Sequence, residues 1–140
     1  MPLPKFANRL LAGMLAGATS AAAMAEQVAC HYTYGGESRV LTARPVASPY
    51  AVPAIRVGSF FKFRVVFQTR PADLASIKVY AYADRDGGPE PIHQAIYPYP
   101  PAADHGAPYG FTGRQFVYEP ELGGELEYWC RIEPDGEAAE

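Results

Sequence analysis

Residues 59–68 read SFFKFRVVFQ, which is the clearest secondary-structure signal in the chain. Phe61, Phe63, Val65 and Phe67 share one side of an extended backbone, and two basic side chains lie among the residues between them. A period of two with one apolar side is typical of a β-strand that packs one face on a core. We therefore predict a strand here, with its aromatic face buried.

Three further stretches, residues 28–34, 76–83 and 126–132, alternate in the same way. Their predicted inward-facing residues are Val28, Cys30, Tyr32 and Tyr34 in the first, Ile77, Val79, Ala81 and Ala83 in the second, and Leu126, Tyr128, Cys130 and Ile132 in the third. Shorter candidate strands cover residues 38–43, 54–57, 92–97 and 115–119, with Gly- and Pro-rich turn signals between them. Seven or eight short strands predict an all-β fold, a small antiparallel β-sandwich, with a small β-barrel as the alternative.

The segment Tyr128-Trp129-Cys130 carries a resemblance to a known architecture. Tyr128 stands two residues before Cys130, and this spacing resembles the tyrosine corner of immunoglobulin-type domains. The resemblance implies an immunoglobulin-like sandwich. The chain departs from that pattern because little chain precedes Cys30 and because Trp129 adjoins the second cysteine instead of following the first.

The chain has two cysteines, Cys30 and Cys130, and both fall on predicted inward faces. There is no C-x-x-C spacing, so a redox pair or a thiolate metal site is disfavoured. We predict one buried disulfide between the first and last strands, formed in an oxidising compartment.

Residues 1–25 are predicted to be a cleaved secretory signal peptide. Lys5 and Arg9 form its basic start, an apolar run follows from Leu10, and an A-x-A cleavage site ends at Ala25. The apolar run is only about 9 residues long, whereas a membrane-spanning helix needs roughly 20. Residues 26–140 are then a single exported domain, located in the periplasm or secreted.

A lipid anchor at Cys30 is a less favoured fate of this segment. Gln27 occupies a position where lipid modification favours an aliphatic residue, and Glu26 interrupts the apolar stretch. Lipidation would also leave Cys130 without a partner.

The charge balance bears on the partner class. The whole chain has a formal net charge of −3, and removal of Lys5 and Arg9 with the signal leaves 10 basic against 15 acidic residues, or −5. No cluster of Lys and Arg is present to neutralise phosphates. Nucleic acid is therefore not an expected partner.

A Pro/Tyr/Gly-rich loop is predicted at residues 98–113, because the chain shows no strand alternation between Tyr97 and residue 115. Long loops in compact domains are usually functional or disordered, and the aromatic residues of this one argue against disorder. Its Tyr-Pro repeats favour an extended geometry that presents side chains at low entropic cost. The predicted binding residues are Tyr97, Tyr99, Tyr109 and Phe111. The alternative is that these rings fold back and cap an open end of the sandwich.

The three histidines, His31, His93 and His105, are the side chains best suited to bind a metal at neutral pH. No two of them are spaced as a recognisable ligand pair, so no metal or cofactor is predicted. We include His93 and His105 among the candidate binding residues of the loop region. A metal or small-ligand carrier that uses them is an alternative function.

The sequence contains no recognisable catalytic motif: no G-x-S-x-G elbow, no Gly-rich phosphate loop and no selected carboxylate pair. We therefore expect a non-enzymatic exported protein that binds a protein partner in the cell envelope through the aromatic, proline-rich loop.

A second function is inhibition of a secreted enzyme such as lysozyme. Cys30 with the following Gly35-Gly36 turn, Cys130 near the end and the net acidity resemble small bacterial lysozyme inhibitors. Their negative charge suits a basic target.

Overall fold

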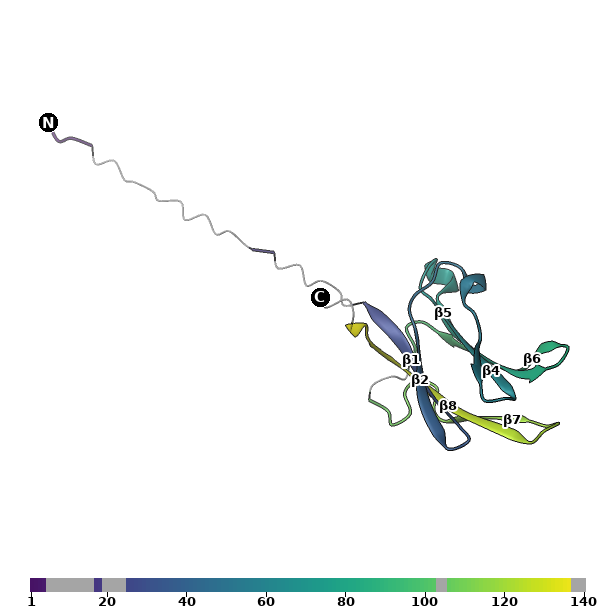
Figure 1. Cartoon of the computed structure of the whole chain (residues 1–140). Helices are drawn as coiled ribbons and strands as arrows, with labels where there is room; N and C mark the ends of the chain where they lie inside the picture. Colours follow the sequence, from purple (N-terminus) through teal and green to yellow (C-terminus); the bar gives the residue numbers. More distant parts are fainter. Residues whose placement is uncertain (5–16, 19–24, 103–105, 137–140) are drawn as a thin grey trace.

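In the computed structural model the described residues are 1–4, 17–18, 25–102 and 106–136. Most of the predicted signal peptide and His105 lie outside these ranges, so the expectations made for them remain predictions. Residues 25–136 contain all the strands (Figure 1).

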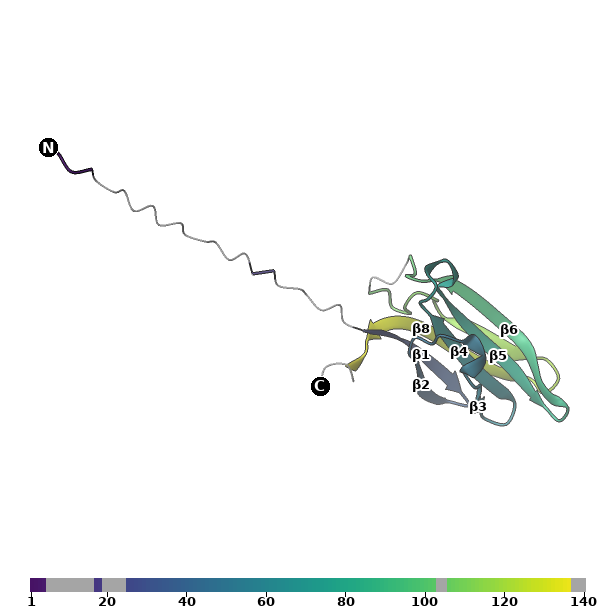
Figure 2. The same cartoon turned by 90° about the horizontal axis from the view of Figure 1, so that it is seen from above.

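The strands are β1 (Glu26–Tyr34), β2 (Glu37–Ala43), β3 (Ile55–Val57), β4 (Phe61–Gln68), β5 (Ser76–Arg85), β6 (Gly88–Pro98), β7 (Gln115–Glu119) and β8 (Gly124–Pro134). They form two four-stranded antiparallel sheets, in the orders β2-β1-β8-β7 and β3-β4-β5-β6. The sheets lie as two layers (Figures 1 and 2). The predicted β-sandwich and strand number are confirmed, and the barrel alternative is wrong because the described strands form two separate sheets.

Two short 3-10 helices, η1 (Pro49–Ala51) and η2 (Ala72–Leu74), lie in the connections. Within the part of the chain that the structure describes, no helix has the length and apolarity needed to cross a membrane.

The residues predicted to face inward are buried or partly buried in the four longest stretches, but the expected solvated face is incomplete: Ala29 of β1 and Val66 of β4, at outward positions of the alternation, are also buried. In β4, Phe61, Phe63, Val65 and Phe67 are all at most 2% exposed, and they meet the inward faces of the neighbouring strands in one core. β6 is longer than predicted: it begins at Gly88, whereas the sequence predicted a start at residue 92. The early part of β6 contains prolines, which an edge strand tolerates because one side of its backbone makes no ladder hydrogen bonds.

The predicted disulfide is confirmed. Cys30 and Cys130 face each other directly on β1 and β8, with 4.0 Å between their Cα atoms, and both are fully buried. A disulfide indicates an oxidising location outside the cytoplasm.

Two details differ from the immunoglobulin pattern. The immunoglobulin disulfide joins the two sheets, whereas this one joins neighbouring strands of the same sheet. The hydroxyl of a tyrosine corner bonds to the backbone, whereas the Tyr128 hydroxyl shares a hydrogen bond with His93.

The four tight hairpin turns lie at one end of the sandwich, which we call the hairpin end. Gly58, before β4, lies against Tyr34 at the end of β1, and Gly124, at the start of β8, lies near Phe61. Arg85 of β5 is paired with Glu121 in the turn before β8. The long connections and the first residues of β1 therefore lie at the opposite end.

Candidate functional site

The loop at residues 98–113 carries the chain from β6 in one sheet to β7 in the other. The Tyr99 ring packs edge-on against Phe67, with 4.8 Å between the ring centroids, and its hydroxyl donates a hydrogen bond to Glu26. Partial burial, together with the neighbouring Glu26 carboxylate, raises the pKa of Tyr99 to about 12. The first half of the loop is therefore anchored at its tyrosine.

The second half of the loop is anchored against β8. The backbone N–H of Phe111 donates to the Cys130 carbonyl at 3.0 Å, and the Cys130 N–H donates to the Thr112 hydroxyl at 2.9 Å. Gly110 has φ +59°, and a Cβ there would lie 2.0 Å from the Cys130 carbonyl oxygen. Only glycine fits this approach, because both the backbone conformation and the contact exclude a side chain.

The predicted binding residues divide into two groups. Tyr97 is partly buried and meets the Phe111 ring edge-on at 5.2 Å, and Phe111 is only 9% exposed. With Tyr99 they pack toward the core, as the capping alternative expects, and a binding role for these three rings remains a prediction. Tyr109 is 41% exposed and packs outside the core.

His93 makes an internal hydrogen bond. Its Nε2 lies 2.6 Å from the Tyr128 hydroxyl, and the two rings meet edge-on. Burial lowers the pKa of His93 and raises the pKa of both Tyr97 and Tyr128, so all three groups are neutral at pH 7. Among the described residues no group of three His, Cys, Asp or Glu side chains could hold a metal ion.

A cluster of rings lies on the outer face of the sheet that contains β8, with Trp129 at its centre. His31 is the cross-strand neighbour of Trp129, and their rings stack at 4.0 Å with an interplanar angle of 5°. Tyr109 meets the Trp129 ring edge-on at 5.9 Å, and the Arg131 guanidinium lies over it at 4.9 Å. Tyr109 thus joins the loop to the sheet.

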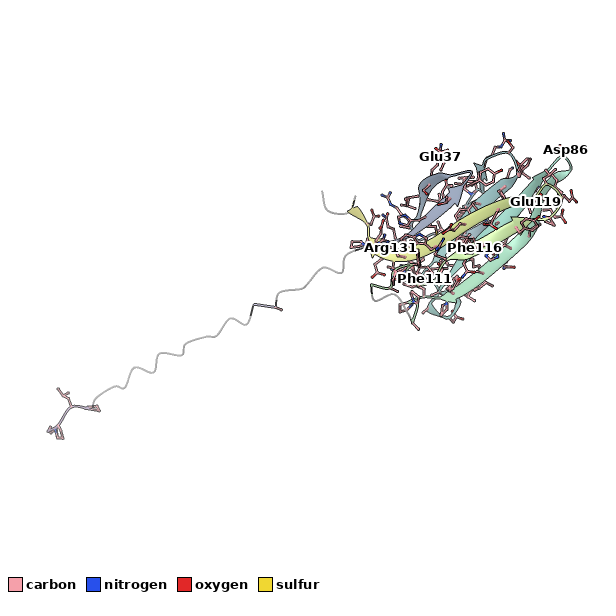
Figure 3. All side chains as sticks on the ribbon, turned by 90° about the horizontal axis from the view of Figure 1, so that it is seen from below. Glu37, Asp86, Phe111, Phe116, Glu119 and Arg131 are labelled. Carbon is pink, nitrogen blue, oxygen red and sulfur yellow. A yellow bond between two sulfur atoms is a disulfide. The ribbon has the colours of Figure 1, made fainter. Side chains whose placement is uncertain are left out.

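Arg114 extends this cluster toward β7. Its guanidinium lies over the ring of Tyr109 at 5.1 Å and over that of Phe116 at 5.3 Å, and its Nε donates to Glu127 at 2.7 Å. Phe116 is 55% exposed. We name the cluster the aromatic-arginine face; its residues are His31, Tyr109, Arg114, Phe116, Trp129 and Arg131. Figure 3 labels Phe116 and Arg131 on β7 and β8 of this sheet.

The two arginines of the aromatic-arginine face differ in their charge environment. Glu127 neutralises Arg114, whereas no carboxylate of the described residues lies within ion-pair distance of Arg131, which is exposed. Burial, and then the positive charge of Arg131, lowers the pKa of His31, so the imidazole is neutral at pH 7. Arg131 therefore presents its N–H groups to solvent while the indole supports the guanidinium.

Sequence reasoning identified one residue of this face, Tyr109, as a binding residue. The signal that could have found more was the alternation of β8, which puts Trp129 and Arg131 on the side away from the core. Tryptophan side chains are usually largely buried. A tryptophan at a position that the alternation places outward is therefore a signal of a functional surface.

In comparisons with known proteins, no family model, no curated protein and no solved structure gives a significant match to this chain.

Proposed function

We propose that the mature chain is an exported, non-enzymatic binding protein of the periplasm or the extracellular space, and that it holds a protein partner on the aromatic-arginine face. The observation that carries this proposal is the exposed assembly in which Tyr109 and Arg131 contact the Trp129 ring and Arg114 joins Tyr109 to Phe116. Tyrosine, tryptophan and arginine are the residues that contribute most to protein interfaces. The assembly lies outside the core, so packing of the sandwich does not require it.

The contacts favour a polypeptide over a flat sugar ring. His31 and Arg131 both lie over the Trp129 ring, so the indole offers little open surface for stacking. A partner meets instead the N–H groups of Arg131 and the rings of Tyr109 and Phe116. That combination suits a surface with a carboxylate beside apolar side chains, because guanidinium pairs with carboxylate in a two-bond geometry.

In this proposal only one residue of the Pro/Tyr-rich loop contacts the partner. Its anchored residues, Tyr99 and Phe111, hold the loop in place, and Tyr109 makes the contact. Because Gly110 and Thr112 fix the backbone beside Cys130, Tyr109 is ordered before a partner arrives. Preordering lowers the entropic cost of binding.

The test is quantitative co-purification of the tagged mature chain from cell-envelope extract of the organism that makes it. Tyr109→Ser, Phe116→Ser and Arg131→Gln are compared with Tyr50→Ser, Leu74→Ser and Arg70→Gln, which alter exposed residues outside the face. We expect a stoichiometric protein with wild type and controls, depleted about tenfold or more by each face variant. Equal recovery with all six variants, or no stoichiometric protein, would contradict the proposal.

Inhibition of a secreted enzyme such as lysozyme is a second candidate, and one feature favours it. Asp84, Asp86, Glu119 and Glu121 line a cavity of about 260 Å³ at the hairpin end together with Arg85, which pairs with Glu119 and Glu121. The four carboxylates outnumber the one guanidinium, so the lining keeps a negative charge that would face a basic enzyme surface. A lytic assay with purified chain in large molar excess tests it. Unchanged lysis would remove this candidate.

A further inference from the structure

A second cavity, of about 460 Å³, opens at the hairpin end between β2 of one sheet and β3 of the other. These are the edge strands of their sheets, and no third strand closes the space between them among the described residues. The volume lies within the range of small-molecule sites. No residue of the aromatic-arginine face lines this cavity.

Tyrosine rings form one wall of the cavity. Tyr34 meets the Phe61 ring edge-on at 5.5 Å, and Tyr32 packs against Phe63 at 5.6 Å, so both rings are supported by the core. Gly58 has φ +58°, and a Cβ there would lie 2.0 Å from Cε1 of Tyr34. The missing side chain at Gly58 leaves the space that the Tyr34 ring occupies.

Two guanidinium groups border the same cavity, one from each sheet. Arg39 is the cross-strand partner of Tyr32 and therefore projects toward the side of the sheet that faces the core. Its Nε and Nη2 donate to one oxygen of Glu37, which leaves the Nη1 side available for another acceptor. Arg56 comes from β3 and forms an ion pair with Asp84, with 3.6 Å between its Nε and the carboxylate, too long for a hydrogen bond, so its N–H groups can still donate to a ligand. Glu37 also lines the cavity, so two guanidinium groups face one lining carboxylate.

We propose that this cavity binds a small amphipathic anion, with a carboxylate, sulfonate or phosphate group held by Arg39 and Arg56 and an apolar body against Tyr32 and Tyr34. Guanidinium groups recognise such oxyanions through paired hydrogen bonds. The acidic balance of the chain makes the convergence of two arginines on one cavity informative. The lining combines tyrosine rings with charged side chains, which suits a ligand that has an apolar body and a charged end.

The test uses 1-anilinonaphthalene-8-sulfonate as the probe and N-phenyl-1-naphthylamine, which has the same rings without the sulfonate, as its neutral counterpart. Binding to the mature chain is measured by calorimetry. We expect saturable binding of one sulfonate probe, weakened about tenfold or more by Arg39→Gln and by Arg56→Gln, because each removes a charged hydrogen-bond donor. The neutral probe binds more weakly, and the two substitutions leave its affinity unchanged.

Arg70→Gln is the matched control, because Arg70 is exposed and belongs neither to the cavity nor to the aromatic-arginine face, and it is expected to bind the sulfonate probe as wild type does. Equal binding of the two probes, wild-type affinity in both cavity variants, or an equal loss in Arg70→Gln would overturn the proposal. If a cavity variant fails to fold, amide chemical shifts of the wild-type chain decide the question. Probe-induced shifts around Arg39 and Gly58 support the site, and shifts confined to other regions overturn it.

Discussion

Removal of the disulfide is expected to cost more stability than any single side-chain contact in the domain. The bridge joins residues 100 positions apart and ties β1 to β8 within a ladder that runs from Glu26 paired with Pro134 to Thr33 paired with Glu127. The chain-entropy description assigns about 4.7 kcal/mol to a crosslink that closes a loop of this length. The total unfolding free energy of a small domain is about 5–15 kcal/mol, so the loss is a third of it or more.

The perturbation is Cys30→Ala with Cys130→Ala, measured by urea unfolding at pH 7. The expected result is a fall of about 3–5 kcal/mol in the free energy of unfolding and a steeper dependence on urea, because the unlinked denatured chain exposes more surface. Wild type unfolded and refolded in a reducing agent is the control, since it keeps both side chains and lacks only the bond. A loss below about 1 kcal/mol in both samples would refute the entropic reasoning.

A glycine, two histidines and a buried carboxylate each have a role that substitution can test. Gly110→Ala is expected to lower the free energy of unfolding by more than the roughly 1–3 kcal/mol of an unfavourable left-handed residue, because its Cβ would also meet the Cys130 carbonyl. Gly35 has a similar φ but open space around it, so Gly35→Ala loses only the conformational part. Urea unfolding of both variants checks this difference. The domain loses stability as pH falls below 6.5, because folding lowers the pKa of His31 and His93 and the unfolded chain therefore takes up protons first. Unfolding midpoints measured from pH 7.5 to 5 check this, and we expect a weaker pH dependence in a His31→Phe/His93→Gln variant. Glu119→Gln lowers the thermal midpoint more than Glu121→Gln, because the buried Glu119 carboxylate accepts N–H bonds from Glu121 and Leu122 and pairs with Arg85, whereas Glu121 is exposed; equal midpoints would contradict this.

The strands and most of their buried faces could be predicted because β1, β5 and β8 and the first half of β4 largely alternate between buried and more exposed residues. Phe63 and Tyr128 are examples: a period of two along their own strands was enough to place them inside. The second half of β4, buried on both sides, and the edge strand β6, with no buried residue, do not follow that pattern. The alternation could not decide between a sandwich and a barrel, because that choice depends on which strands lie at the edges of a sheet. Local alternation is the same in both architectures.

The candidate site was only partly predictable, because its contacts depend on register and on the path of the loop. His31 and Trp129 stack because Cys30 lies opposite Cys130, and this alignment places their neighbours side by side. In the loop, no repeating pattern distinguishes Tyr99, which packs inward, from Tyr109, which packs outward. That difference arises from the bonds to Glu26 and to the Cys130 backbone, far away in sequence.

The most direct test of the proposed binding face is photo-crosslinking in living cells from a benzophenone amino acid placed at position 116. The same amino acid at position 50 is the control, since Phe116 and Tyr50 are both exposed but only Phe116 belongs to the face. We expect one discrete crosslinked protein from position 116, reduced by Arg131→Gln, and none at that mass from position 50. The same product from both positions, or no product from position 116, would contradict the assignment of the aromatic-arginine face as the binding surface.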